Sequence, residues 1–253
     1  MATIPLALQL YTVRDLASND FPGTLERVAG IGYDGVEIAG VTGGMDAPDL
    51  KMLLDDLGLK VCGSHTGLDQ LENDLDSVVE FNKTLGNEHV VVPYLGEDRR
   101  QGAQGWRETA AAMNAVGSRL KDVGLTLCYH NHSFEFQQFD GQFGLDIFYE
   151  ACDPNLVQAE LDTYWVQHGK QDPVAYIRKY AGRVPLVHLK DMSAGDNPTF
   201  AEVGTGIMDF DGIVRAAQEA GTKWFIVEQD TTPGNPMVSA RISFQNIKER
   251  GWA

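Results

Sequence analysis

The sequence predicts an α/β protein, a (β/α)8 TIM barrel that forms a single domain over residues 1–253. The chain length of 253 residues is close to the roughly 250 that are typical of this fold. About eight short apolar segments alternate with segments of helical periodicity, which is the pattern of repeated βα units. No Ser/Pro-rich linker divides the chain, so a single barrel is the simplest topology.

The predicted strands are short and mostly apolar, as parallel strands covered on both faces should be. The first, residues 6–11, is almost wholly apolar. Pro93 fits only the end of its strand, because proline cannot donate to a sheet ladder. In chain order we expect strands at residues 6–11, 34–39, 59–63, 89–94, from 125 onward, 157–161, 184–189 and 224–228.

The predicted helices place apolar residues on one face. The helix at 49–58, for example, has a stripe of four leucines. Gly30-Ile-Gly32 stops the preceding helix, since glycine readily adopts the conformation of a helix end. We expect helices at residues 21–30, 49–58, 71–86, 106–123, 144–151, 173–181, 210–220 and 239–250. The long loops follow the strands, and active sites of such barrels lie at that end.

Composition restricts the function. The formal net charge of −16 opposes binding to nucleic acids and anionic membranes, because these partners carry like charge. We therefore expect a small-molecule partner, no nucleic acid and no membrane. The N-terminus lacks a basic segment followed by an apolar core, which predicts a cytoplasmic protein. Cys62, Cys128 and Cys152 are expected to be buried free thiols.

Polar residues that can bind a metal follow four of the predicted strands. Asp162, His188 and Glu228 end the last three, and His130 and His132 follow residue 125 on one strand face. The carboxyl ends of parallel strands meet at one end of a barrel, so we expect these side chains to meet. Imidazole and carboxylate ligands suit Mn, Zn, Co or Fe. Taken singly, each residue could instead cap a turn, fill the core or form an ion pair.

The segment after residue 125 offers three residues for two roles. His130, His132 and Glu135 can each be a metal ligand, and those that do not bind metal are candidates for a catalytic base. Imidazole titrates near neutral pH, and burial can raise the pKa of a glutamate towards it. The residues alone do not assign the two roles.

Other residues near the predicted strand ends could contact a substrate. Lys190 could stabilise an oxyanion or hold a substrate oxygen, and a salt bridge to Glu160 or Asp191 is the structural alternative. Gly204-Thr-Gly206 lacks the pattern of a phosphate loop and predicts a simple turn. The remaining candidates for the cavity wall are Glu37, His65, Tyr94 and Trp165, together with Tyr11 and Trp106. Barrel filling and aromatic packing are the structural alternatives for these residues.

Five motifs carry a resemblance to a known family. They are Leu8-Gln-Leu-Tyr-Thr-Val-Arg-Asp15, Gly32-Tyr-Asp-Gly-Val-Glu37, Tyr129-His-Asn-His-Ser-Phe-Glu135, Leu161-Asp-Thr163 and His188-Leu-Lys-Asp191. Together they resemble the xylose isomerase-like TIM-barrel superfamily, in particular its sugar phosphate isomerase/epimerase-type members. The resemblance covers nearly the whole chain. It does not select a substrate, because the superfamily also includes endonuclease IV, hydroxypyruvate isomerase, inosose dehydratase and ketose 3-epimerases.

The resemblance implies one divalent metal ion, with Mn, Zn, Co or Mg as candidates, held at the ends of strands five to eight. Asp162, His188 and Glu228 match the ligands of the last three strands. On the fifth strand many relatives have glutamate where alignment through Asn131 places His130. We therefore expect His130 to be the fourth ligand.

That departure from the family pattern also affects the base. In the epimerases the fifth-strand glutamate is both a ligand and one of two proton-transferring carboxylates. Glu135 is the rival of His130 as ligand, and His132 or Glu135 is the expected base. Many relatives also have a histidine near position 165 that contacts substrate, and this chain has Trp165 there.

The resemblance implies a metal-dependent isomerase or epimerase of a sugar, keto-sugar or polyol. The metal would stabilise an enediolate, and His132, Glu135 or Glu228 would move the proton. A lyase or dehydratase acting on a 3-keto-glycoside or an inosose at the same site is the alternative. A non-catalytic sugar-binding barrel is a third hypothesis, and association into a homo-oligomer stays open.

Overall fold

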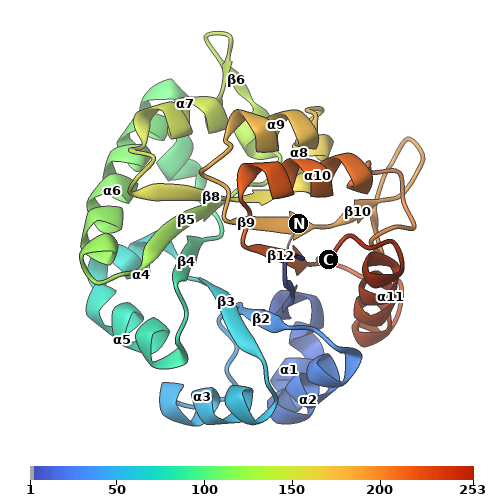
Figure 1. Ribbon diagram of the computed structural model, residues 1–253. Coiled ribbons are helices and arrows are strands. Elements are labelled where there is room, and N and C mark those ends of the chain that lie inside the picture. The colour runs from blue at the N-terminus through green and yellow to red at the C-terminus, as the bar shows by residue number, and fades with distance from the viewer. Residues whose placement is uncertain (1–2) are drawn as a thin grey trace.

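Eight parallel strands close into a barrel in the computed structural model, which describes residues 3–253 (Figure 1). The order round the barrel is β1-β12-β9-β8-β5-β4-β3-β2. The strands are β1 (Leu6–Gln9), β2 (Gly35–Ile38), β3 (Lys60–His65), β4 (His89–Val92), β5 (Thr126–His130), β8 (Val157–Asp162), β9 (Leu186–Leu189) and β12 (Trp224–Val227). The predicted (β/α)8 barrel is confirmed.

Helices surround the strands on all sides (Figure 1). One principal helix follows each strand, because a parallel neighbour is reached only by a crossover outside the sheet. These helices are α2 (Phe21–Ile31), α3 (Ala47–Asp56), α5 (Leu75–Leu85), α6 (Gly102–Asp122), α7 (Gly144–Ala151), α9 (Pro173–Lys179), α10 (Phe210–Ala220) and α11 (Pro236–Glu249). Their positions agree with the predicted helices to within a few residues.

Several short elements were not predicted. The helices α1 (Arg14–Asn19), α4 (Leu68–Asn73) and α8 (Thr163–His168) have six residues each, too few to show a clear helical period. The hairpins β6 (Gln138–Phe139) with β7 (Gln142–Phe143) and β10 (Asp191–Met192) with β11 (Phe200–Ala201) lie in loops after barrel strands. The first strand also ends before Tyr11, because the Gln9 side chain accepts the Tyr11 N–H and starts a 3-10 turn.

The inside of the barrel changes from apolar to polar along its axis. Its apolar layer consists of Ala7, Cys62, Val91, Cys128, Leu186 and Ile226. Gln9 and His188, two residues after Ala7 and Leu186, are fully buried polar side chains, as is Glu160 of β8. Because successive inward positions are two residues apart, this layer lies closer to the carboxyl ends of the strands. The candidate site lies directly next to this polar layer.

All three cysteines are free and buried, as predicted. Burial raises the pKa of the Cys62 and Cys128 thiols well above their ordinary value. A thiol held in its neutral form is a poor nucleophile and a poor metal ligand.

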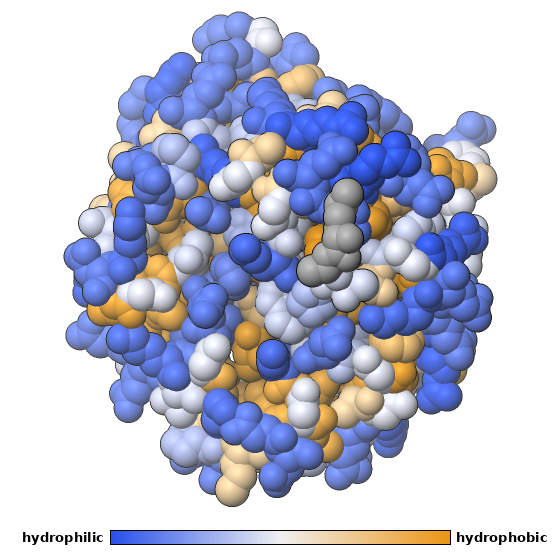
Figure 2. Space-filling view, viewed as in Figure 1, coloured by the Kyte–Doolittle hydropathy of each residue, from blue (hydrophilic) through white to orange (hydrophobic). Residues whose placement is uncertain are grey.

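On the face of the molecule seen in Figure 2, hydrophilic residues predominate and hydrophobic residues show between them in small groups. The apolar faces of the helices therefore point towards the barrel. Within residues 3–253, no helix combines the length and the apolar character that crossing a membrane requires.

Candidate active site

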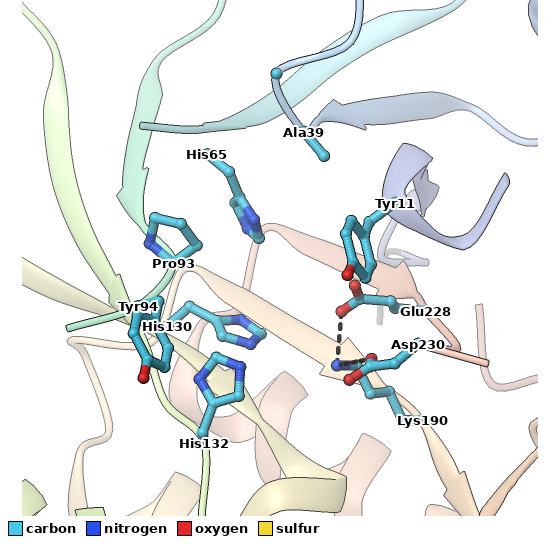
Figure 3. A pocket seen from close by; sticks show the side chains of 11 residues that line it. Tyr11, Ala39, His65, Pro93, Tyr94, His130, His132, Lys190, Glu228 and Asp230 are labelled. Atoms are coloured by element: carbon cyan, nitrogen blue, oxygen red, sulfur yellow. Dashed lines mark hydrogen bonds and ion pairs between the residues drawn. The ribbon is translucent and has the colours of Figure 1, made fainter. Parts of the chain in front are cut away.

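A cavity of about 370 Å³ opens at the carboxyl ends of the strands. Figure 3 shows His130 and His132 on one side of it, and Lys190, Glu228 and Asp230 on another. The lining residues are Tyr11, Ala39, Gly40, His65, Pro93, Tyr94, His130, His132, Lys190, Glu228 and Asp230. The cavity lies where catalytic sites of TIM barrels are found.

The four residues predicted as metal ligands lie together beside this cavity. His130, Asp162, His188 and Glu228 each offer a donor atom, and these four atoms lie within 4.8 Å of one another. Strand register produces the arrangement, since Asp162 pairs with His188 between β8 and β9. We call these four residues the ligand cluster.

The ligand cluster has the chemistry of a divalent metal site. His188 Nδ1 lies 2.9 Å from Glu228 Oε2 and 3.9 Å from Asp162 Oδ2. His130 Nε2 lies 3.7 Å from Asp162 Oδ2, a buried oxygen that pairs with the Lys190 ammonium at 3.0 Å. Two imidazoles and two carboxylates are a mixed nitrogen and oxygen donor set that suits Zn, Mn or Co. The residues present therefore fit such an ion.

Asp162 is held by hydrogen bonds on its other side. Its Oδ1 accepts the Trp165 N–H at 2.9 Å and caps α8. The Asn131 side chain accepts the Asp162 N–H at 3.0 Å and so connects the end of β5 to the end of β8. These contacts leave Oδ2 directed at the ligand cluster.

Lys190 is buried among three carboxylates at the edge of the cluster. Its Nζ lies 2.7 Å from Glu228 Oε2, 2.8 Å from Asp230 Oδ1 and 3.0 Å from Asp162 Oδ2. Burial by itself lowers the pKa of Lys190, but the three negative charges outweigh it and raise the pKa. Lys190 is therefore protonated where it lines the cavity.

The alternative partners expected for Lys190, Glu160 and Asp191, were wrong. Glu160 contacts histidines, and Asp191 organises the following loop. Asp191 Oδ2 accepts the N–H groups of Gly204 and Gly206, at 2.9 and 2.8 Å. Those two amides are thus engaged by a carboxylate, which agrees with the predicted turn.

A second layer of polar side chains lies below the ligand cluster. Glu160 Oε1 is 3.0 Å from His65 Nε2, 3.0 Å from His130 Nδ1 and 3.1 Å from His188 Nε2. Glu37 Oε2 is 2.7 Å from His188 Nε2 and accepts a hydrogen bond from Gln9. Burial alone lowers the pKa of His65, but Glu37 and Glu160 outweigh it and raise the pKa to about 10.

The expectation that Glu37 faces the cavity was therefore wrong. Glu37 is fully buried and is not a lining residue. A β-bulge between β2 and β3 places Gly63 against it, where a Cβ would lie 2.3 Å from Glu37 Oε1. Glycine is therefore required for this close approach.

His132 lines the cavity as a neutral imidazole. Burial and the charge of Lys190 lower its pKa to about 3. Its ring stacks on Phe134, with centroids 5.5 Å apart, and packs against Trp165 behind it. Nδ1 is buried and has no hydrogen-bond partner among the described residues.

Glu135 lies outside the cavity, in contrast to its predicted role as a base or ligand. Its Oε1 accepts the Tyr129 hydroxyl at 2.6 Å, and its Oε2 accepts the His132 N–H at 2.9 Å. Burial raises the pKa of Glu135 to about 7. Oε1 is thus held by a side-chain hydroxyl and Oε2 by the backbone N–H of His132, so neither is directed at a bound molecule.

The aromatic candidates divide into two groups. Tyr94 and Tyr11 line the cavity and are 52% and 43% exposed, so both are accessible to a ligand. Trp165 does not line it, and lies behind His132 and within 5.7 Å of the Lys190 ammonium. Trp106 is buried in the helix layer.

Residues 25–249 match the sequence profile of the xylose isomerase-like TIM barrel family. The chain belongs to this family. Among curated relatives, the inosose dehydratase of Geobacillus kaustophilus is 25% identical over 91% of this chain and 90% of its own length. Other relatives with that name match over 150 to 164 residues, so that the chain spans about half of their length.

Solved structures of xylose isomerase-like proteins share the fold. A sugar phosphate isomerase/epimerase from Parabacteroides distasonis superposes with a TM-score of 0.87 at 26% identity, over 100% of this chain and 96% of that one. A zinc-bound IolI protein superposes with a TM-score of 0.76 at 16% identity, over 98% and 96% of the two chains.

Three polar residues of this xylose isomerase-like site were not among the predicted site residues. They are Gln9, Glu160 and Asp230. Glu160 stands two residues before Asp162 and Asp230 two residues after Glu228, and alternation along a strand puts each pair on one face. That spacing was the available signal. For Gln9, a single amide at the end of an apolar strand, the sequence contains no comparable signal.

Proposed function

We propose that this protein removes a β leaving group, water in the simplest case, from a keto-polyol or keto-sugar. The first step is loss of the proton on the carbon beside the carbonyl. The observation that carries the proposal is that His132 and Lys190 line one cavity together with His130 and Glu228 of the ligand cluster. That cavity offers a base, a cation and metal ligands to a single bound molecule.

A divalent ion held by the ligand cluster would act as a Lewis acid, polarising the substrate carbonyl and acidifying the neighbouring carbon. The four donor atoms of the ligand cluster, which lie within 4.8 Å of one another, support this donor set. The zinc in the structurally similar IolI protein also supports it. His130 and His188 would bind such an ion as neutral rings, and Asp162 and Glu228 would supply the negative charge.

His132 is the proposed base. Its Nδ1 is enclosed, so Nε2 is the nitrogen left to take the proton. The lowered pKa keeps the ring unprotonated throughout the neutral range. So weak a base accepts a carbon-bound proton only when the resulting negative charge is strongly stabilised, and the Lys190 ammonium contributes to that stabilisation.

Lys190 is the proposed acid for the leaving group. The C–H electron pair becomes a new C=C bond, the C–O bond at the β carbon breaks, and the departing oxygen takes a proton from Lys190 Nζ to leave as water. His132 has then gained one proton and Lys190 has lost one. Exchange with solvent restores both residues, since both line the open cavity.

The relatives favour this elimination over the isomerase or epimerase reaction expected first. The relative that aligns over 91% of the chain is named an inosose dehydratase. The isomerase remains the second candidate, because the Parabacteroides distasonis protein at 26% identity is named a sugar phosphate isomerase/epimerase. Both reactions begin with the same proton removal and differ in the fate of the carbanion that it forms.

Product analysis in D2O separates the two. The metal-loaded protein is incubated with inososes, 3-keto-glycosides and ketoses, and products are identified by mass spectrometry and NMR. Loss of water or of an aglycone supports the elimination. A product of unchanged formula that carries solvent deuterium supports the isomerase. Sugar binding that survives chelation, with neither reaction, would support a non-catalytic barrel and reject the proposal.

A further inference from the structure

Glu160 contacts more imidazole rings than the other carboxylates of the site. One oxygen, Oε1, lies 3.0 to 3.1 Å from ring nitrogens of His65, His130 and His188. The side chains of Glu160 and His188 are fully buried, and that of His130 is 3% exposed. Water therefore has little access to the ring nitrogens of His130 and His188, and the carboxylate decides where their protons sit.

The two nitrogens of each ligand ring face different carboxylates. His130 directs Nδ1 to Glu160 and Nε2 to Asp162. His188 directs Nε2 to Glu160 and Glu37, and Nδ1 to Glu228 and Asp162. Each ring thus has one nitrogen close to Glu160 and the other close to a carboxylate of the ligand cluster.

We propose that Glu160 is a positioning residue for both imidazole ligands: it sets the tautomer of His130 alone and that of His188 together with Glu37, so that His130 presents Nε2 and His188 presents Nδ1 to the metal. The inference rests on the proposed function, because it concerns the ion bound by the ligand cluster. It assigns a role to a residue that itself touches neither the ion nor the substrate.

The physical reason is the single proton of a neutral imidazole. A carboxylate accepts hydrogen bonds and does not donate, so the ring nitrogen that faces Glu160 must carry the proton whenever the opposite nitrogen gives its lone pair to a metal. The lone pair is then on the opposite nitrogen, where a metal can take it. Carboxylates behind histidine ligands orient the ring and strengthen the metal bond in this way.

A competing arrangement places a metal ion between Glu160 and the three histidines that surround it. His65, His130, Glu160 and His188 also offer donor atoms within 4.8 Å of one another. If both sites were filled, His130 and His188 would each bind through both nitrogens and would lose the remaining ring proton. Hydrogen bonding to Glu160 requires no such loss, which favours one ion per chain.

Glu37 provides the comparison residue. It is as buried as Glu160 and lies 2.7 Å from His188 Nε2, but no contact joins it to His130 among the described residues. Removal of its charge should therefore disturb one ligand ring, whereas removal of the Glu160 charge should disturb both.

The first test needs no variant. Long-range 1H–15N NMR on the zinc-loaded wild-type protein with 15N-labelled histidine reports which nitrogen of each ring carries the proton. We expect a proton on Nδ1 of His130 and on Nε2 of His188, with zinc on the other nitrogens. A proton on Nε2 of His130, or two zinc ions per chain, would overturn the inference.

The second test compares zinc affinity by competition with a chromophoric chelator. Glu160→Gln should weaken binding by about 10- to 100-fold, and Glu37→Gln by less. Asp146→Asn, which removes a carboxylate bonded to Tyr180 outside the site, should leave affinity unchanged. Equal losses of zinc affinity in Glu160→Gln and Glu37→Gln would show that Glu160 acts only through its negative charge, and would overturn the inference.

The outcomes for the two proposals are distinct. A wild-type protein that binds no zinc and no other divalent ion contradicts the proposed function. A wild-type protein that binds zinc, with unchanged affinity in Glu160→Gln, contradicts only the role of Glu160.

Discussion

Lys190 and Glu228 form a buried ion pair at the mouth of the barrel, with 2.7 Å between Nζ and Oε2 (Figure 3). The same ammonium lies 3.0 Å from Asp162 Oδ2. It therefore balances the two carboxylates that belong to the ligand cluster. We expect both the stability of the metal-free protein and its activity to depend on that balance.

Lys190→Met removes the charge and keeps most of the apolar stem. In chelator-treated protein we expect the free energy of unfolding to fall by about 3–5 kcal/mol, since the carboxylates lose a buried partner. Added Zn²⁺ should recover part of the loss, because its charge replaces the ammonium. Urea unfolding with EDTA and with Zn²⁺ measures both. Lys121→Met, at an exposed position, is the control, and equal stability of the two variants would contradict the prediction.

His188→Ala should abolish both bound metal and turnover. The substitution removes a ligand and leaves Glu37, Glu160 and Glu228 without the ring between them. Metal content by mass spectrometry and turnover of the wild-type substrate are measured together. His168→Ala, at an exposed position on α8, should retain both. Full activity in metal-free His188→Ala protein would refute the metal site.

His132→Gln should lower kcat/KM by about 10²- to 10⁴-fold, the contribution of a positioned general base. Metal content should not change, because His132 is outside the ligand cluster. Exchange of the substrate α-proton with D2O should fall in parallel. If exchange continued at the wild-type rate, another group would be the base.

Glu135→Gln should change how stability depends on pH. In the folded protein burial raises the pKa of Glu135 from 4.5 to about 7. The folded state therefore binds more protons than the unfolded state between these values, and the free energy of unfolding falls as pH rises through this window. The cost above pH 7 is on the order of 3 kcal/mol.

The neutral amide of Glu135→Gln can still accept the His132 N–H, so the variant should lose this pH dependence. Urea unfolding at pH 5 and pH 8 tests it, with exposed Glu150→Gln as the control. Identical pH profiles of the wild type and Glu135→Gln would disprove the assignment.

Gly206→Ala should loosen the loop after β9. A Cβ there would lie 2.2 Å from the Met192 carbonyl oxygen and 2.4 Å from Asp191 Oδ1, so the turn held by Asp191 must shift. We expect faster amide exchange over residues 193–209 and a loss of about 1–3 kcal/mol. Gly30→Ala, where a Cβ meets no atom within 4 Å, should leave exchange in this loop unchanged. Equal exchange in both variants would argue against the role of Asp191.

The sequence by itself determined the barrel and the ligand cluster. Apolar strands and amphipathic helices alternate along the whole chain, and parallel topology then requires the strand ends to meet. His130, Asp162, His188 and Glu228 could be chosen because each stands at the end of a strand. Their meeting within 4.8 Å depends on the strand order and on the register that pairs Asp162 with His188.

Only the tertiary structure decided which neighbouring residues face the cavity. By residue type alone, Glu37, Glu135 and Trp165 cannot be distinguished from Asp230, His65 and Tyr94, which line the cavity. A β-bulge, a tyrosine hydroxyl and a neighbouring imidazole direct the first three away from the cavity. Side-chain direction at a strand end depends on such contacts between distant segments, and residue type and spacing do not encode them. Alternation along β8 places Glu160 on the same face as Asp162, but only the tertiary structure brings three imidazoles to its Oε1.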